Sequence, residues 1–354
     1  MSTFNRFATP RAYVDLISYL LSTGWRDLSN FSLRQDGSDT INIVNGVEAN
    51  LYDMRPHDYL ELNLNNQAFY IQIDLGATNT AITESSFLAI LNHNFEESES
   101  VFKVEVDADS AFGSSTVITN SSNHDAFGVN DRQWSVDDNF IHPEFNGWSL
   151  ITFGKVTSDS RYLRVTIQDS SGASANFGGN PIIGGLMFGE YIDFPVSPEL
   201  GIKTSYAYDN TVLSSSTGGN TFANSTNFGS PTWSASLPFV NTAGAGQEGY
   251  YFEKRHGRQK HSMNFSYISD TDLFTTNQFA SVNDNATHFY DAETLHSNFY
   301  NRILGQHQPF LFSIDSTSTS EGDYGMYRMA KDSFTATQVA NRAYNIGLDL
   351  VETW

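Results

Sequence analysis

Strict alternation of apolar and polar side chains is the feature of this sequence that most limits its fold. Along residues 101–107, Phe102, Val104 and Val106 alternate with polar side chains, and residues 163–168 alternate in the same manner. A β-strand sends successive side chains to opposite faces, so each segment predicts a strand with one face in a core. Further strands are predicted at 70–75, 148–153, 186–192, 263–267 and 346–350. Many short strands separated by turn-rich spacers predict an all-β fold.

Two segments carry helical signals instead. Near the N-terminus, Thr9 as a cap, Pro10 at the first helical position and Gly24 just past the end predict one short amphipathic helix. In the second half, Asp291 predicts the cap of another helix, which Gly305 closes. Both helices are expected to flank sheets.

The length of 354 residues predicts two domains. Pro195 and Pro198 stiffen the chain and mark a boundary, which gives domains at 1–194 and 195–354. The first domain is expected to be a β-sandwich, and the second a β-sandwich or small barrel with one flanking helix. A Ser/Thr/Asn/Gly tract at 214–230 has little to bury and predicts a long loop or an extended arm.

Composition excludes several classes of protein. The formal net charge is −21, which opposes specific nucleic-acid binding. Cysteine is absent, so no disulfide, thiolate nucleophile or zinc finger is expected. The longest apolar run, 87–91, is far shorter than the roughly 20 residues of a membrane span. No secretory signal is recognised near the N-terminus, so synthesis in the cytoplasm is expected.

One basic cluster interrupts this acidic chain. Its charged members lie within seven positions and are Lys254, Arg255, His256, Arg258 and Lys260. One interpretation is an exposed connection before the strand at 263–267. The other is an inter-subunit contact for an acidic surface, and a second copy of the chain offers such a surface, which favours a ring.

Other candidate residues are aromatic or titratable. Trp134 and Trp148 predict stacking on sugar rings if they lie at one end of a sandwich, or sealing of the core beneath loops if they do not. His93 ends an apolar run between two asparagines and is predicted to hydrogen-bond a turn. No nucleophile elbow, phosphate loop, dinucleotide fingerprint or metal-ligand spacing is present, so no catalytic residue, metal or cofactor is predicted, and the chain is not expected to be an enzyme. A pair of glycosidase carboxylates that meet only in space stays open as an alternative.

Several ordered motifs carry a resemblance to known families. They are Asn50-Leu-Tyr-Asp-Met-Arg-Pro56, Phe69-Tyr-Ile-Gln-Ile-Asp-Leu-Gly76, Arg161-Tyr-Leu-Arg-Val165 and Gly184-Gly-Leu-Met-Phe-Gly189. In this order they resemble a discoidin-type, galactose-binding-like jelly roll, in which loops at one end hold ligand. Two of these motifs, together with Phe7-Ala-Thr-Pro-Arg-Ala-Tyr-Val-Asp-Leu16 and Phe87-Leu-Ala-Ile-Leu-Asn-His-Asn-Phe95, also resemble virion structural proteins of tailed marine bacteriophages. The second half, with Leu304-Gly-Gln-His-Gln-Pro-Phe-Leu-Phe312 and Leu348-Asp-Leu-Val-Glu-Thr-Trp354, is similar to the tail-tip, distal-tail and baseplate-type proteins of such phages.

The resemblance implies a virion structural protein, assembled in the host cytoplasm and located in the tail. It would form a homo-oligomeric ring and contact other tail proteins through its second domain, while the first domain decorates the exterior. Two alternatives stay open, namely a host glycan- or receptor-binding module of the tail and a capsid decoration protein. A host-surface glycan is therefore a further candidate partner.

Overall fold

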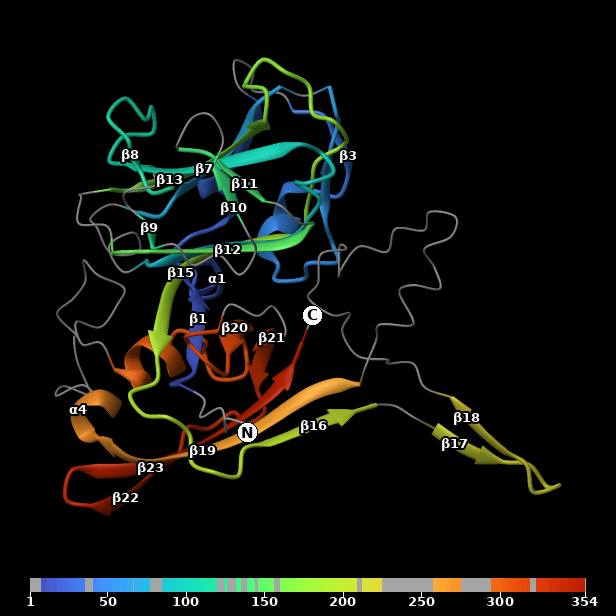
Figure 1. The fold of residues 1–354 in the computed structure, drawn as a ribbon, viewed down its shortest axis with the longest axis vertical. Coiled ribbons are helices and arrows are strands. Elements are labelled where there is room, and N and C mark those ends of the chain that lie inside the picture. The colour runs from blue at the N-terminus through green and yellow to red at the C-terminus, as the bar shows by residue number, and fades with distance from the viewer. Residues whose placement is uncertain are drawn as a thin grey trace, which may run out of the picture.

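The structure, a computed structural model, describes residues 8–35, 41–65, 67–76, 85–119, 124–125, 132–134, 139–143, 146–155, 160–208, 212–224, 257–274, 294–318 and 323–353. Within these residues the chain is built mostly of strands, which pair antiparallel in several sheets, with a few short helices (Figure 1). This confirms the all-β fold predicted from the alternation.

The N-terminal half is a sandwich of two sheets. The outer sheet has the order β10 (Arg132–Trp134), β11 (Ile141–Pro143), β7 (Ser100–Asp107), β13 (Tyr162–Asp169), β5 (Phe69–Asp74) and β2 (Phe31–Gln35), with β8 (Thr116–Val117) beside β7. The facing sheet contains β15 (Gly185–Asp193), β6 (Phe87–His93), β12 (Gly147–Phe153) and β9 (His124–Asp125). A small sheet at one end contains β14 (Ile182–Ile183), β4 (Leu60–Leu62) and β3 (Ile43–Asn45). The 3₁₀ turn η2 (Glu48–Tyr52) lies beside it, and another 3₁₀ turn, η1 (Leu28–Asn30), precedes β2.

The sandwich core follows from the alternation. On β7, Phe102, Val104 and Val106 point inward and are fully buried, and they meet Leu88 and Ile90 of β6 in one cluster. Two sheets with aligned apolar faces bury those faces against each other, which is the arrangement expected of a jelly-roll sandwich.

The C-terminal half continues one of these sheets. From β15 the order runs through β1 (Arg11–Asp15), β20 (Phe310–Ser313), β21 (Tyr324–Met329), β23 (Ala343–Glu352) and β19 (Arg258–Ser269) to β16 (Lys203–Ala207), with β22 (Ala336–Ala340) beside β23. The helical segments α4 (Asp270–Leu273) and η3 (Leu295–Tyr300) lie beside this sheet (Figure 1). Phe265, Phe299 and Leu348 belong to a second core between η3 and the sheet.

A third core joins the two halves. It forms on the face of β6 and β12 that points away from the sandwich core. There the Trp148 ring lies 5.6 Å from the ring of Tyr324, and the Tyr13 ring lies 5.2 Å from that of Phe87, centroid to centroid. Because these side chains are buried between the halves, the second face of the β6–β12 pair is covered by the C-terminal half.

The N-terminal segment differs from its prediction. Residues 11–15 form β1 instead of helix, and α1 (Leu16–Ser22) begins only after Asp15, whose carboxylate accepts hydrogen bonds from the backbone N–H groups of Ile17 and Ser18. Pairing with β15 on one side and β20 on the other gives this segment backbone hydrogen bonds and burial that a surface helix lacks, and outweighs its local signals. Gly24, with φ of +74°, follows the helix as predicted.

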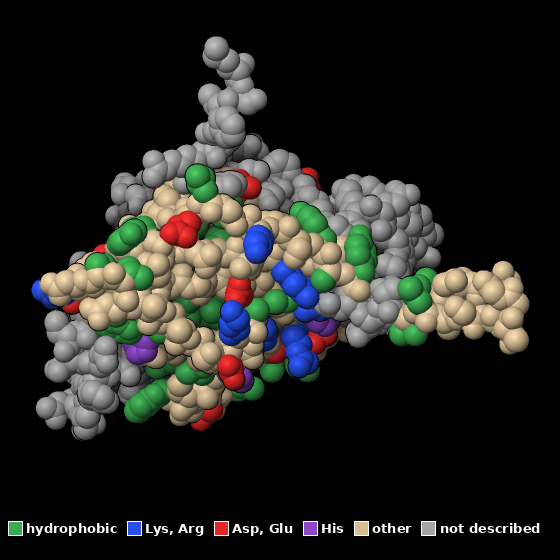
Figure 2. Space-filling view, turned by 90° about the horizontal axis from the view of Figure 1, so that it is seen from below, with side chains coloured by type: hydrophobic (Ala, Val, Ile, Leu, Met, Phe, Trp, Pro, Cys, Tyr) green, Lys and Arg blue, Asp and Glu red, His purple; other side chains and the backbone are tan. Residues whose placement is uncertain are grey.

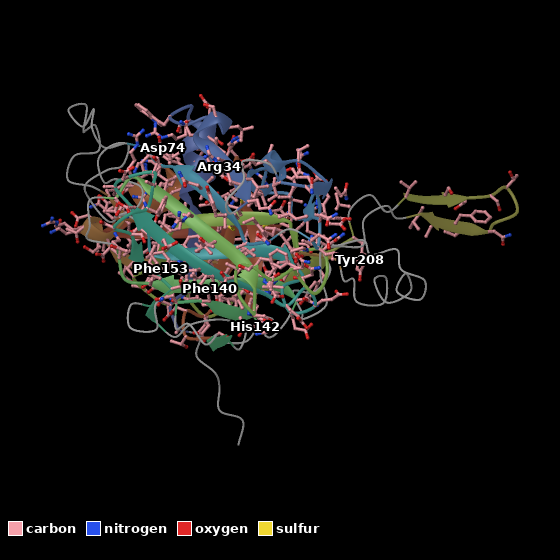
Figure 3. The ribbon with its side chains drawn as sticks, turned by 90° about the horizontal axis from the view of Figure 1, so that it is seen from above. Arg34, Asp74, Phe140, His142, Phe153 and Tyr208 are labelled. Carbon is pink, nitrogen blue, oxygen red and sulfur yellow. The ribbon has the colours of Figure 1, made fainter. Side chains whose placement is uncertain are left out.

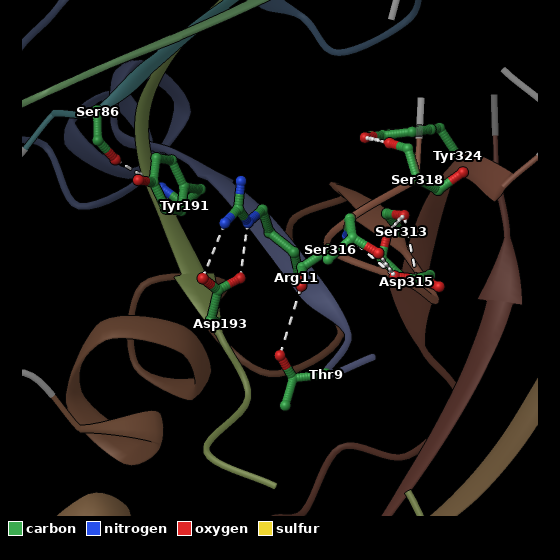
Figure 4. A network of polar contacts seen from close by, with 11 residues as sticks. Thr9, Arg11, Ser86, Tyr191, Asp193, Ser313, Asp315, Ser316, Ser318 and Tyr324 are labelled. Atoms are coloured by element: carbon green, nitrogen blue, oxygen red, sulfur yellow. Dashed lines mark hydrogen bonds and ion pairs between the residues drawn. The ribbon is translucent and has the colours of Figure 1, made fainter. Parts of the chain in front are cut away.

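Side chains fix β1 in place (Figure 4). Arg11 donates from Nε and Nη2 to the two carboxylate oxygens of Asp193 at 2.6 and 2.8 Å, and its guanidinium lies 4.1 Å from the ring centre of Tyr191. On the other side, the N–H of Ser316 donates to the carbonyl of Thr9 at 2.9 Å. The predicted boundary at 194 coincides with the end of β15, but the sheet crosses it through β1.

The second predicted helix begins later than expected. Thr294 caps η3, a π-helix, while the predicted cap Asp291 lies outside the described residues. Gly305, with φ of +67°, ends the turns that follow, as predicted.

The predicted arm is a β-hairpin. Strands β17 (Val212–Ser215) and β18 (Thr221–Asn224) pair only with each other among the described strands and project from the body of the molecule (Figure 1). Every one of these residues whose side chain is described is exposed. The remainder of the tract, 225–230, lies outside the described residues.

Candidate functional site

The basic cluster is only partly described. Lys254, Arg255 and His256 lie outside the described residues. Arg258 and Lys260 stand on the outward side of β19, where Arg258 Nη1 donates to the carbonyl of Glu352 at 3.2 Å. Figure 2 shows Lys and Arg side chains gathered on this underside of the C-terminal half. The inter-subunit contact at this cluster stays a prediction.

The structure corrects the prediction made for Trp148. Its side chain is 1% exposed and packs in the core between the two halves, so no ligand at the surface can stack on it. The glycan contact predicted at Trp148 is therefore wrong, and the alternative of a sealed core holds. Trp134 lies on β10, paired with Ile141, and its side chain is not described.

His93 holds a turn, as predicted. Its Nδ1 accepts the backbone N–H of Phe95 at 3.3 Å, and its Nε2 lies 2.8 Å from the hydroxyl of Ser149. Burial lowers the pKa of His93 to about 3, so the ring is neutral at physiological pH. This histidine is structural.

The loop end of the sandwich was expected to hold ligand by family resemblance. Its described asparagines bind the loops to one another. Asn94 donates to the carbonyl of Asn180 at 2.8 Å and accepts the N–H of Ile182 at 2.7 Å, and Asn180 donates to Glu61 at 2.6 Å. These contacts hold the described loops at this end of the sandwich to one another.

A different surface presents an ordered polar array. We define the outer face as the outward side chains of β2, β5 and β13: Ser32, Arg34, Tyr70, Gln72, Arg164, Thr166 and Gln168. All are at least partly exposed, whereas the residues between them are buried in the sandwich core. Figure 3 looks down from above and places Arg34 and Asp74 toward one side of the sandwich and Phe140 and His142 toward the other.

Strand register arranges this face in rows. Arg34 of β2 stands opposite Tyr70 of β5, which stands opposite Thr166 of β13. The adjacent row sets Gln72 beside Arg164. Directly opposed side chains in a sheet are about 5 Å apart, so donors, acceptors and the Tyr70 ring form one continuous surface.

Arg164 is fixed between rings and a carboxylate. Its guanidinium lies 4.1 Å from the ring centre of Phe112 and 5.5 Å from that of Tyr70. Its Nη2 lies 3.1 Å from Oε2 of Glu105, a carboxylate that also faces Lys103 Nζ at 3.2 Å. Contacts on several sides hold the guanidinium plane in one orientation.

Neighbouring cations keep two carboxylates beside the outer face, those of Glu105 and Asp74, charged. Burial alone raises the pKa of Glu105, but Lys103, the hydroxyl of Ser115 and Arg164 outweigh burial and hold that pKa below its ordinary value. At the end of β5, burial is likewise outweighed by Arg161, whose paired hydrogen bonds of 2.8 and 2.6 Å lower the pKa of Asp74. The charges are fixed in place before any ligand arrives.

Sequence reasoning missed this face. The alternation assigned Arg164, Thr166 and Gln168 to the outside of a strand, but it could not show which strands are neighbours. The signal that was available is the presence of Arg and Tyr at outward positions, where an ordinary solvated face often carries Lys and Glu.

One pocket lies elsewhere, at the junction of the halves. It has a volume of about 240 Å³ and is lined by Glu190 and Asp193 of β15, Asp272 of α4 and Asn298 of η3, among others. Glu190 is buried and its carboxylate already has partners. Lys155 Nζ lies 2.7 Å from it, Asn298 donates a hydrogen bond to it at 3.0 Å, and Arg302 forms an ion pair with it. These contacts make Glu190 a link between the halves.

Two further findings concern the described residues alone. No group of three or more His, Cys, Asp or Glu side chains among them is placed to hold a metal ion. None of their helices is long and apolar enough to cross a bilayer.

Comparison with known proteins gives weak likenesses. No family model and no curated protein matches the chain. Among solved structures it is similar to chitosan-binding module 1 of a chitosanase/glucanase from Paenibacillus sp. IK-5, at 14% identity and a TM-score of 0.28, over 45% of this chain and 92% of that one. A CBM32 module of Clostridium perfringens in complex with GlcNAc-α-1,4-galactose gives 15% identity and a TM-score of 0.25, over 42% and 88%.

A Ruminococcus gnavus GH29 fucosidase gives 15% identity and a TM-score of 0.29, over 49% of this chain and only 28% of the enzyme. Likenesses this weak assign neither family nor function. The class that this chain's own geometry defines is an all-β protein with an N-terminal sandwich, and the sandwich displays a fixed polar and aromatic surface.

Proposed function

We propose that the protein binds carbohydrate through the outer face of its N-terminal sandwich. The observation that carries this is the row of Arg34, Tyr70 and Thr166, with Gln72 and Arg164 beside it. A sugar presents hydroxyls that both donate and accept hydrogen bonds and a C–H face that packs on an aromatic ring. This face offers donors, acceptors and a ring within one surface.

Rigidity supports the same proposal. The side chains stand on paired strands, and Arg164 is held by Phe112, Tyr70 and Glu105. Binding loses affinity when side chains must be ordered on contact, and a surface that is already ordered avoids part of that loss. A preorganised planar array suits a ligand that is itself a rigid ring.

A glycan array tests the proposal. The purified chain is applied to neutral and acidic polysaccharides, alongside Tyr70→Ala, Arg34→Ala and the matched control Tyr267→Ala. Tyr267 is 73% exposed on β19 of the other half. The expected result is binding to at least one glycan class, about fivefold to tenfold weaker for Tyr70→Ala and unchanged for the control. Absence of binding, or equal binding by Tyr70→Ala, would refute the proposal.

We also propose a second role, as a self-associating structural component of a phage tail. One feature of the structure favours it over an isolated binding module, namely the hairpin of β17 and β18, which projects from the body and carries exposed Val212, Leu213 and Phe222. Exposed apolar side chains on a projecting element are typical of contact with another polypeptide. In this role the sandwich displays its outer face on the assembly.

Native mass spectrometry of the purified chain tests self-association. The proposal expects one defined multiple of the 39.4 kDa chain. A monomer at every concentration would contradict it. Catalysis has no part in either role.

A further inference from the structure

Two elements of this chain, far apart in the sequence, both expose apolar side chains. The first is the arm, defined as the hairpin of β17 and β18, where Val212, Leu213 and Phe222 are 62%, 68% and 58% exposed. The second is the β3 patch, defined as Ile43, Val44, Val47 and Leu64, which are between 41% and 58% exposed. Both elements therefore expose apolar side chains that a partner could cover.

The arm gains little stability from its own contacts. An isolated two-stranded hairpin is marginal in water, because few residues are ordered against few contacts. Leu213 and Ala223 are paired on one face of the hairpin, while Val212 and Phe222 lie diagonally on the other, so both faces carry apolar groups. Neither strand pairs with a third among the described residues.

The β3 patch also has an unpaired edge. In its small sheet β3 is the terminal strand, paired only with β4 among the described strands. Natural edge strands are usually protected by lysine, proline or a covering loop. Residues 41–47 contain neither lysine nor proline, so the β3 edge is suited to accept another strand.

Charge does not oppose a second copy of this chain as the partner. The chain carries a net charge of −21, so two copies repel each other wherever both surfaces are negatively charged. Residues 41–47 and 210–224 contain no charged side chain. The two elements can approach each other closely without placing like charges together.

The positions of the two elements indicate that they meet between copies. In Figure 1, β3 lies at the upper right and the β17–β18 hairpin at the lower right, well separated within one molecule. A contact between different surfaces of identical chains is heterologous, and it closes into a ring or continues as a filament. We propose that the arm of one copy docks on the β3 patch of the next, adding its strands to the edge of β3 that no described strand occupies.

This inference rests on the proposed self-association and names the two surfaces that carry it. The arm variant is the double substitution Leu213→Asp and Phe222→Asp, and the patch variant is Val44→Asp and Val47→Asp. The matched control, Tyr267→Asp with Val339→Asp, alters exposed apolar side chains at 73% and 44% exposure away from both elements. All six positions are exposed, so the variants are expected to fold, which circular dichroism checks.

Sedimentation velocity over a concentration series gives the result. We expect the wild-type chain and the control to associate, and each of the arm and patch variants to associate at least about 30-fold more weakly. An equimolar mixture of the arm variant with the patch variant should form a one-to-one complex, because one intact arm then faces one intact patch.

Three results would overturn the inference. A wild-type chain that stays monomeric would remove self-association itself. Variants that still associate like the wild type would show that other surfaces join the copies, which refutes the arm-to-patch contact while self-association stands. Variants that are monomeric alone and also in the mixture would show that an intact arm does not bind an intact patch, which refutes the arm-to-patch contact.

Discussion

Acid should destabilise this protein through His93. The ring is fully buried, and its pKa in the folded state is about 3, against about 6.5 for an unperturbed histidine. Because the folded state takes up this proton less readily than the unfolded state, the stability that His93 contributes is present above pH 6.5. It is lost as the pH falls toward 3.

The size of the effect follows from these two values. Between pH 6.5 and pH 3, each pH unit removes about 1.4 kcal/mol from the free energy of unfolding for this one group. From pH 7 to pH 5 the loss attributable to His93 is about 2 kcal/mol. His261, whose pKa burial lowers to about 4, adds a loss of the same sign over the same interval.

Urea unfolding at pH 7, 6 and 5 measures this effect. His93→Gln removes the titrating ring but keeps a polar group near Ser149. We expect its free energy of unfolding to fall by about 1.4 kcal/mol less per pH unit than that of the wild type between pH 6 and 5. Val339→Gln, at an exposed position without a titrating group, is the control and should leave the slope unchanged. Equal slopes for His93→Gln and the wild type would refute the argument.

Three further substitutions test how the halves are joined. Trp148→Ala empties part of the core between them and should cost about 3–5 kcal/mol in urea unfolding; a loss under about 1 kcal/mol would contradict its burial. Arg302→Met removes the buried cation beside Glu190 but leaves Lys155 in place, and should cost about 1.5–3 kcal/mol, more than Lys155→Met at a partly exposed position; the reverse order would argue against the link. Gly189→Ala places a Cβ about 2.0 Å from the carbonyl of Val14 and should abolish folded yield, whereas Gly113→Ala, with open space, should not. Normal circular dichroism for Gly189→Ala would contradict the close approach of β1 and β15.

Strands β2 and β6 of the sandwich were not predicted. Alternation predicted β7 and β13, because period two identifies a strand wherever only one face is buried. It could not reveal the covering of the second face. Strand β12 is buried on both faces, and Trp148 lies on the face opposite Ile151. Only the fold of the distant C-terminal half shows that this second face is covered.

The N-terminal prediction failed for a related reason. Thr9, Pro10 and Gly24 are local signals, and they favour a helix. Residues 11–15 are strand because partners nearly 180 and 300 residues away in the sequence pair with them. Long-range pairing of this kind leaves no trace in a window of local sequence.

The outer face was partly foreseeable. Outward positions such as Arg164 and Thr166 follow from alternation within one strand. The row that joins them to Arg34, Tyr70 and Gln72 depends on strand order and register. A shift of one residue in that register would turn the same side chains into the core.

A structure of the chain with the oligosaccharide selected by the glycan array tests the central claim most directly. The account predicts a sugar ring packed on Tyr70, with hydroxyls within about 3 Å of Arg34 or Gln72. A sugar bound at the loop end of the sandwich, or in the pocket beside Glu190, would contradict it.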